Sequence, residues 1–452
     1  MRTGKLLEEM PGFAVVWAGQ SVSLIGTSMA NFALTIWAWQ VTGKATALAF
    51  VWLVHIVPLV LLSPIGGALI DRWDRRWAMM LTDLGAGAAT IGLLILYLAG
   101  VLQVWHVYVA TFIAGAFQSL QYPAYSAAVA NMLPKEHYQR ANGLVGMAGS
   151  ASNIIAPAIA GALMPLIGLL GVFLIDIGTF VFAISMLLLV RIPQPGRTRP
   201  RVPMRKALWS DTRSGLRYLF SHRSYVALLL YLFTSNALVV AFYGGLVSPA
   251  VLARTGTSEL ILGAVRMGAG IGGTIGGACI AVWGGVKRKI YGILGGSFLF
   301  ALSIGTLFAL GRGPAFWIAS TIIASFAWQF TVASSFALWQ SKVPLHMQGR
   351  VFANRRMISA GGQPFALLLV GILADRVFEP MMLAGGTATR LFGPLVGTGP
   401  GSGMALLVII VALTLMGVVA LGCMSSSLRN IEDLVPDHDE QLEENATSDE
   451  DV

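Results

Sequence analysis

The chain has 452 residues, of which 56% are hydrophobic and only 11% are charged, whereas roughly 25% are charged in a typical soluble domain. This composition excludes a cytosolic enzyme, a disulfide-rich secreted protein and a disordered protein. The formal net charge of +9 combines a basic body, in which residues 1–425 hold 29 bases and 11 acids, with an acidic C-terminus. The composition therefore predicts a membrane protein with many spans.

Twelve apolar segments are long enough to cross a membrane as helices, which takes about 20 residues each. Several of them lack Asp, Glu, Lys and Arg altogether, and no charged residue lies between Glu9 and Lys44. Spanning strands would show alternating polarity over about ten residues, and no segment does so. The sequence predicts an all-α membrane protein with twelve transmembrane helices, at residues 12–38, 46–70, 77–99, 104–131, 141–166, 168–190, 224–250, 258–283, 289–311, 314–340, 351–375 and 403–426.

The basic residues are distributed unevenly between the two sides of this arrangement. If the N-terminus is cytoplasmic, the inside segments hold 24 Lys and Arg residues, and Arg266 lies inside the eighth helix. Cytoplasmic loops carry an excess of Lys and Arg, so we expect both termini to be cytoplasmic. The outside loops then hold only five bases, namely Lys44, Arg254, Arg312, Arg376 and Arg390.

One long loop interrupts the helices. From Arg191 to Arg223 it carries nine bases and four prolines, and in its second half Leu208, Leu216 and Leu219 fall near one helical face. This pattern predicts an amphipathic helix on the anionic inner leaflet. No folded domain accompanies the basic stretch, so we do not expect nucleic acid as a partner. The chain divides into an N-terminal six-helix bundle (1–190), a cytoplasmic linker (191–223), a C-terminal six-helix bundle (224–426) and an acidic tail (427–452) that we expect to be disordered.

The two halves resemble each other at a constant offset. Leu133-Pro134 lies just before Arg140, and 210 residues later Val343-Pro344 lies at the same distance before Arg350. Parallel six-helix pseudo-repeats are a transporter design in which the substrate binds at their interface near the middle of the membrane.

The turn after the second predicted helix carries a family motif, Gly67-Ala68-Leu69-Ile70-Asp71-Arg72-Trp73-Asp74-Arg75-Arg76. It resembles motif A of the major facilitator superfamily, G-x-L-x-D-R-x-G-R-R, with Asp74 where many members have glycine. The form D-R-W-D-R-R looks like the macrolide-efflux branch of the drug:proton antiporters, which also includes siderophore exporters. The resemblance extends from residue 10 to about 425 and implies the major facilitator fold.

The resemblance also implies a role for the turn. In the family, the motif Asp faces the N-terminal end of helix 11, where the helix dipole favours an anion. Asp71 would then be a conformational latch, supported by Gly67 and by a network of Arg72, Arg75 and Arg76. The alternative is that these arginines serve only as a positive-inside anchor.

Helix 5 carries a weaker resemblance. Gly149, Pro157 and Gly161 fall in a run similar to the antiporter motif G-P-x-x-G-G, with alanine in place of two glycines. Such residues bend a helix and permit close packing. In the family, helix 5 packs against helix 8, which is also rich in glycine here.

Ionisable residues at membrane depth are functional candidates. Desolvation raises the pKa of a carboxylate, and histidine titrates near neutrality, so either group could carry a coupling proton. Structural pairing or capping is the alternative for each residue. The candidates for proton coupling are Asp176, His55, Asp83 and, as a partner charge, Arg266.

The substrate cavity is expected to be apolar with few polar groups. In this family helices 1, 4, 7 and 10 line it. The candidate lining residues on these helices are Asn31, Trp37, Gln118, Gln121, Asn236, Trp328 and Gln329.

These observations favour a bacterial cytoplasmic-membrane exporter of amphiphilic, drug-like or macrolide-like small molecules. It would work by alternating access in exchange for protons. We expect no cofactor and no metal, a proton gradient as the energy source, and a monomer in the lipid bilayer. The alternatives are a dedicated exporter of a siderophore or small peptide product, and a transporter-fold sensor or scaffold that signals through the acidic tail. An intramembrane enzyme would need H-E-x-x-H or paired carboxylates on one helix face, and the sequence has neither.

Overall fold

The computed structural model describes residues 11–70, 74–133, 138–190, 192, 204–344, 347–383, 386 and 388–435. These residues form helices and no strand, which confirms the predicted all-α fold. Ten helical stretches in the described part are long and apolar enough to cross a membrane. The first bundle consists of α2 (Pro11–Thr42), α3 (Ala45–Ile70), α4 (Arg75–Leu98), α5 (Val104–Met132) and α6 (Tyr138–Leu189).

The helix α6 contains two of the predicted spans. It runs for 52 residues and is interrupted at Gly168, whose φ of +63° suits a residue without a side chain. The break falls at the first residue of the sixth predicted span. The helix α5 is not among the ten stretches, although its 29 residues pack against α3 and α4. The number twelve therefore stays a prediction, while the described helices fit it.

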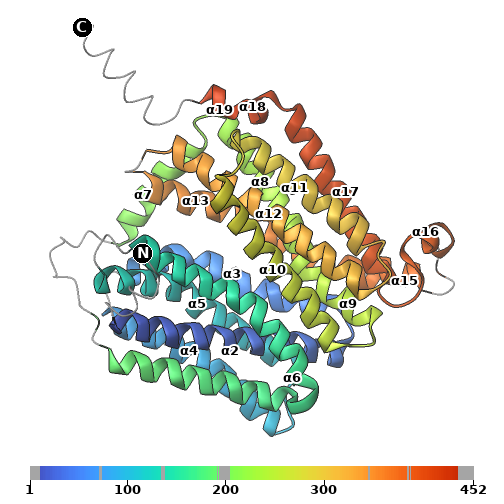
Figure 1. The fold of residues 1–452 in the computed structure, drawn as a ribbon, viewed down its shortest axis with the longest axis horizontal. Helices are drawn as coiled ribbons and strands as arrows, with labels where there is room; N and C mark the ends of the chain where they lie inside the picture. Colours follow the sequence, from blue (N-terminus) through green and yellow to red (C-terminus); the bar gives the residue numbers. More distant parts are fainter. Residues whose placement is uncertain are drawn as a thin grey trace.

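The second bundle is built in the same way from longer and shorter pieces. Three of its spans contain a π-helical turn, at Ala241–Leu246, Ile304–Phe308 and Ala374–Phe378. Figure 1 shows this bundle above the first one, with α7 (Met204–Leu219) at one side. Its helices are α8 (Arg223–Val240), α9 (Val247–Arg254), α10 (Glu259–Trp283), α11 (Lys289–Ser303), α12 (Pro314–Lys342), α13 (Gln348–Ala360), α14 (Gln363–Leu373), α15 (Glu379–Met382), α16 (Thr389–Val396) and α17 (Ser402–Met424).

The two bundles meet through a common apolar core. One cluster of buried side chains includes Ile36 and Phe173 from the first bundle and Phe242 and Leu407 from the second. The bundles therefore share buried apolar surface, and Ile36, Phe173 and Leu407 lie toward the ends of their spans that are opposite α7.

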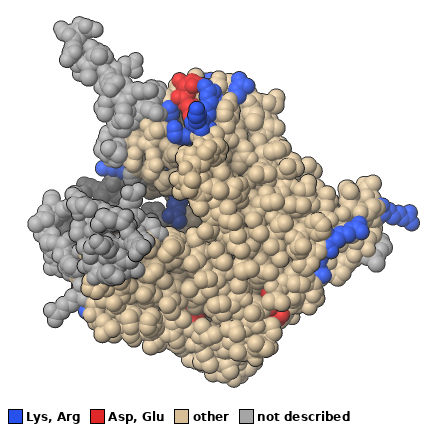
Figure 2. All heavy atoms as spheres, in the orientation of Figure 1, with Lys and Arg blue, Asp and Glu red and all other residues tan. Residues whose placement is uncertain are grey.

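Hydrogen bonds between the bundles lie at the end opposite α7. Both carboxylate oxygens of Asp375, after α14, accept backbone N–H groups at the start of α3, from Ala45 at 2.9 Å and Thr46 at 2.7 Å. Nearby, Gln40 Nε2 donates to Glu259 Oε1 at 3.1 Å. Figure 2 shows a hollow between the bundles on the α7 side. In this conformation hydrogen bonds join the two bundles at the end opposite α7, and a hollow lies between them on the α7 side.

The predicted amphipathic helix exists as α7, but part of its apolar face is not available to a membrane. Leu219 is fully buried in an apolar cluster of the second bundle, and Asn354 of α13 donates to the Thr212 carbonyl at 2.9 Å. The apolar face of α7 therefore packs on the second bundle through Leu219, and its position on the inner leaflet stays a prediction.

The prediction of a disordered tail is wrong for its first residues. After α17 the chain forms the short helices α18 (Ser426–Arg429) and α19 (Ile431–Leu434), with Leu428, Ile431 and Val435 buried. The acid Glu432 accepts the Ile290 N–H at 2.9 Å, and Asp433 pairs with Arg288 at 3.2 Å. Residues 427–435 thus pack against the start of α11, and 436–452 lie outside the described residues.

This packing predicts two different effects of shortening the tail. Ending the chain after Val435 is expected to leave the melting temperature unchanged in detergent. Ending it after Arg429 is expected to lower the melting temperature by several degrees, because the buried Lys342 Nζ loses two acceptors, the Glu432 and Val435 carbonyls. The variant that ends at Val435 also tests the alternative of a sensor or scaffold. That alternative requires the signalling output to depend on residues 436–452, so intact transport without them counts against it.

Candidate functional site

Two adjoining cavities lie within the bundles. The first cavity has a volume of about 510 Å³ and is walled mainly by α2, α4, α5 and α6, with Arg356 of α13 from the second bundle. The second cavity has a volume of about 490 Å³ and is walled by helices of both bundles. Asn31 and His55 belong to the walls of both, so the two cavities adjoin there.

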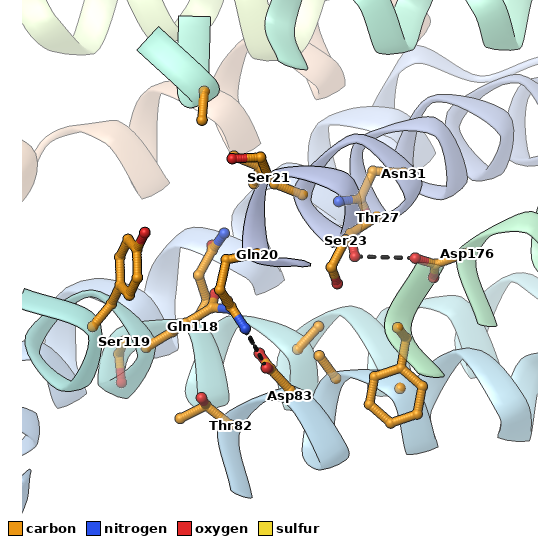
Figure 3. A pocket seen from close by; sticks show the side chains of 18 of the residues that line it. Gln20, Ser21, Ser23, Thr27, Asn31, Thr82, Asp83, Gln118, Ser119 and Asp176 are labelled. Atoms are coloured by element: carbon orange, nitrogen blue, oxygen red, sulfur yellow. Dashed lines mark hydrogen bonds between the residues drawn. The ribbon is translucent and has the colours of Figure 1, made fainter. Parts of the chain in front are cut away.

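The carboxylate of Asp83 lies in the first cavity between two amides. Gln20 Nε2 donates to Oδ2 at 2.7 Å and Gln121 Nε2 donates to Oδ1 at 2.9 Å. These three residues come from three helices, α4, α2 and α5. Figure 3 shows Gln20 pointing at Asp83 across the cavity wall. Asp83 is only 4% exposed, so both of its charged oxygens are held by neutral donors away from bulk water.

The carboxylate of Asp176 lies at another point of the same wall and is held in a similar way. Thr27 Oγ1 donates to Oδ1 at 3.0 Å and Thr90 Oγ1 donates to Oδ2 at 2.8 Å. Figure 3 shows the Thr27 contact between α2 and α6. Among the described residues, neither Asp83 nor Asp176 has a basic partner within ion-pair distance. Each carboxylate thus faces the cavity with hydroxyl or amide partners only.

The wall of the second cavity contains Arg266 and, among the described residues, no acid. Arg266 of α10 lies in its wall and donates from Nη2 to the Tyr243 carbonyl at 3.0 Å and to Ser248 Oγ at 2.7 Å. Its guanidinium carbon lies 5.9 Å from the centre of the Trp52 ring. The two cavities therefore differ in the charge that they offer.

Most of the predicted candidates come together around these cavities. Gln118, Gln121, Asp83 and Asp176 belong to the first, Arg266, Trp328 and Gln329 to the second, and Asn31 and His55 to both.

Two predicted cavity residues lie elsewhere. Trp37 packs against the shared apolar core, and Asn236 Nδ2 donates to the Leu232 carbonyl of its own helix. Neither lines one of the two cavities. A polar or aromatic residue on a cavity-lining helix has several faces to point to, and in these two cases it points away.

Sequence reasoning also missed several cavity residues. The sequence predicts neither the contact of Gln20 with Asp83 nor the place of Trp52, Tyr243 and Ser325 in the second cavity. Of these residues, Gln20 is the one whose role could have been predicted from the sequence, because an amide within a long apolar helix needs a polar partner.

The motif turn is described only in part. Asp71, Arg72 and the side chain of Arg75 lie outside the described residues, and of Gly67 only its place near the end of α3 is described. Asp74, the departure from the family pattern, caps α4 by accepting the backbone N–H groups of Arg76 and Trp77 at 2.9 and 3.1 Å. Arg76 Nη2 donates to the Leu188 carbonyl at 2.7 Å. The substitution of aspartate for glycine therefore supplies a helix cap.

The crossing of α6 and α10 joins the bundles closely. A Cβ on Gly161 would lie 2.8 Å from the Glu259 carbonyl oxygen and 3.2 Å from Gly263 Cα, and the Pro157 carbonyl faces Gly263. These residues belong to the predicted fifth and eighth helices, so the close packing implied by the family resemblance is present. No atom of the described residues lies within 4 Å of the Cβ position of Gly149, which does not contribute to this crossing.

A multi-span helical protein with polar cavities where two bundles meet has the architecture of a membrane transporter. The sequence matches the Major Facilitator Superfamily over residues 16–366. The chain belongs to this superfamily and is a transporter rather than an enzyme.

Individual relatives agree with this assignment. The chain is 27% identical over 371 residues to macrolide efflux protein A of Streptococcus pyogenes, which covers 81% of this chain and 90% of that protein. It is 24% identical over 361 residues to the enterobactin exporter of Salmonella typhi, with 76% and 81% covered. A solved POT family transporter in complex with a thioalcohol-conjugated peptide has a similar fold, with a TM-score of 0.67, 13% identity and coverage of 91% and 95%.

Proposed function

We propose that the protein exports amphiphilic small molecules from a bacterial cell in exchange for protons. The observation that carries this proposal is the pair of cavity carboxylates, Asp83 and Asp176, which have neutral partners only. A carboxylate without a counter-charge in a low-dielectric environment binds a proton readily and releases it when water reaches it. The relatives named for macrolide efflux and enterobactin export support the direction of transport.

The mechanism follows from the arrangement of the two bundles. The two bundles contact each other at Asp375 and leave a hollow between them on the α7 side. In the proposed mechanism, substrate therefore reaches the cavities from the α7 side. A rocking of the bundles about the α6–α10 crossing closes that side and opens the other. Protons from the opposite side then bind Asp83 or Asp176. When the bundles return to the starting conformation, these protons are released on the α7 side. Among the described residues of the first cavity's wall, His55, Tyr125 and Arg356 are the other titratable groups.

The orientation is part of the proposal. The excess of Lys and Arg in the segments on the α7 side supports a cytoplasmic location for that side, with both termini in the cytoplasm. Substrate would then enter from the cytoplasm of a bacterial cell and leave outward. The Asp71 latch would act on the same cytoplasmic side, by analogy with the family motif, and a proton gradient rather than a cofactor would supply the energy.

An accumulation assay in a pump-deficient bacterial host tests the proposal. Cells with the wild-type protein are expected to hold severalfold less of a macrolide or amphiphilic dye than cells with an empty vector. A protonophore is expected to abolish the difference. Asp176→Asn is expected to abolish it too, because its amide binds no coupling proton, and so is Asp71→Asn, which removes the latch charge.

The control for these variants is Glu450→Gln, which removes an acid of the tail and is expected to export normally. Equal amounts of each variant in the membrane are confirmed by immunoblot. Export that survives the protonophore, or an Asp176→Asn variant that still exports against a gradient, would contradict proton coupling through that residue.

A dedicated exporter of one metabolite is the second candidate. The observation in its favour is Arg266, because a charged group in the cavity selects among substrates more strongly than an apolar wall. Comparison of the metabolites secreted by a deletion strain and its parent would identify such a substrate, and identical profiles would count against it.

A further inference from the structure

We propose that the second cavity is a binding subsite for the anionic group of the substrate, with Arg266 as its counter-charge. The substrate class is then an amphiphilic organic anion, such as a carboxylate or sulfonate carried on an aromatic or aliphatic body. This inference rests on the proposed function and specifies the substrate of the same site.

No acidic residue in the described part of the chain pairs with the guanidinium of Arg266. Its Nη2 atom binds the Tyr243 carbonyl and the Ser248 hydroxyl, both neutral acceptors. Its Nε and Nη1 atoms have no hydrogen bond to any described residue. Taking an ion of this kind out of water is costly unless it is paired, so a ligand that brings a negative charge binds strongly.

The wall of the second cavity contains no carboxylate that could pair with Arg266. Asp83 and Asp176 belong to the first cavity, and the second has no Asp or Glu in its wall. His55, where the cavities adjoin, is its other titratable group besides Tyr243. A cationic substrate group would meet like charge here, whereas an anionic one would form charge-assisted hydrogen bonds with two nitrogens of the guanidinium.

The protein holds the guanidinium in place rather than leaving it free. Tyr243 lies in the π-helical turn Ala241–Leu246, a type of distortion common at functional sites, and its carbonyl accepts from Arg266. The Tyr243 hydroxyl and Ser325 Oγ of α12 are 2.6 Å apart, which fixes the ring. A charge held in advance binds a ligand with little loss of side-chain entropy.

The surroundings of Arg266 fit the rest of an amphiphile. Trp52, Trp328 and Phe32 offer apolar and aromatic surface, and Gln329 and Asn153 offer polar contacts. Trp52 comes from α3 of the first bundle and Arg266 from α10 of the second. A substrate between Trp52 and Arg266 would contact both bundles, so its binding and release would affect the interface that moves during transport.

A matched pair of probes tests the subsite. The probes are 1-pyrenebutyrate, an anion, and 1-pyrenebutyltrimethylammonium, a cation with the same apolar body. Their binding to the full-length protein in detergent is measured by quenching of tryptophan fluorescence. We expect the wild type to prefer the anion. We expect Arg266→Gln to weaken anion binding by about tenfold or more and to leave cation binding unweakened, because a charged hydrogen-bond donor is lost.

Two further variants keep the result interpretable. Arg266→Lys retains the charge without the planar fork and is expected to retain part of the anion affinity. Arg312→Gln removes an exposed arginine, which binds the Pro394 carbonyl, and is expected to bind both probes as the wild type does. If Arg266→Gln does not fold, the preference of the wild type and the affinity of Arg266→Lys decide the question.

Equal binding of the two probes by the wild type, or unchanged anion binding by a folded Arg266→Gln variant, would overturn the subsite. Binding is measured without a gradient, so this failure is separate from failure of the proposed function. The latter would appear as the absence of protonophore-sensitive export in cells, whatever the probe preference of the purified protein.

Discussion

Replacing Asp375 by alanine is expected to shift the protein away from the conformation that is joined at the end opposite α7. Both carboxylate oxygens accept N–H groups from the first turn of α3, at Ala45 and Thr46. These N–H groups have no partner within their own helix, and the helix dipole favours an anion there. The contact spans two bundles and some 330 residues of sequence.

The size of the shift follows from the bonds lost. Couplings of this kind are worth about 1–3 kcal/mol, which corresponds to a roughly 5- to 150-fold change in the ratio of two conformations. Breaking both bonds affects only the conformation in which the bundles touch at Asp375. The opposite conformation, which must break them during transport, is unaffected. In the absence of substrate, the variant is therefore expected to populate the conformation in which the bundles are separated at the Asp375 end.

Spin labels at positions 44 and 260 would report the change. Lys44 lies between α2 and α3, and the exposed Leu260 lies in the first turn of α10, so the label distance crosses from one bundle to the other. Cys279 and Cys423 are exposed and are first replaced by serine. In Asp375→Ala the distance distribution is expected to gain a longer component. An unchanged distribution would show that the contact does not hold the bundles together.

Glu379 provides a matched control for this experiment. Its carboxylate also accepts two backbone N–H groups at a helix start, those of Gly401 and Gly403 before and within α17. Both partners belong to the second bundle. Glu379→Gln is therefore expected to lower thermal stability without lengthening the distance between the two labels.

The contrast between Asp375 and Asp83 shows what the sequence could and could not reveal. Both are acids at the edge of or within apolar segments, and such residues are visible as exceptions to the membrane pattern. Their partners are not visible, because the α3 N-terminus and Gln20 are brought to them by the packing of helices. Periodicity gives the helices and their order, whereas the partner across a helix interface depends on how each helix is rotated.

Trp37 and Asn236 illustrate the same limit from the other side. Both lie on predicted cavity helices, but Trp37 faces the apolar core and Asn236 bonds its own backbone. The prediction of disorder is wrong for residues 427–435 for a related reason. The charge pattern of the tail is typical of a solvated segment, but Ile431 and Val435 are buried beside α11. The local sequence pattern does not predict this burial.

Introducing leucine at Gly161 is expected to abolish transport almost completely. The position faces backbone atoms on the partner helix, the Glu259 carbonyl and Gly263 Cα, and neither can move aside as a flexible side chain could. Overpacking of this kind costs about 1–3 kcal/mol in a well-packed interior. Here it also separates α6 from α10, the crossing about which we propose that the bundles rock. Gly161→Ala, with a single added methyl group, is expected to retain part of the activity.

The same helix supplies the control, because no atom in the described part of the chain lies within 4 Å of the Cβ position of Gly149. Gly149→Leu adds the same side chain to α6 and is expected to export as the wild type does. Accumulation in the pump-deficient host gives the activity, and immunoblots of membranes give the amount of each variant. Since both substitutions make the helix equally more apolar, a difference between them reflects the crossing itself. Comparable export by Gly161→Leu and Gly149→Leu would mean that the close approach of α6 and α10 is not needed for alternating access.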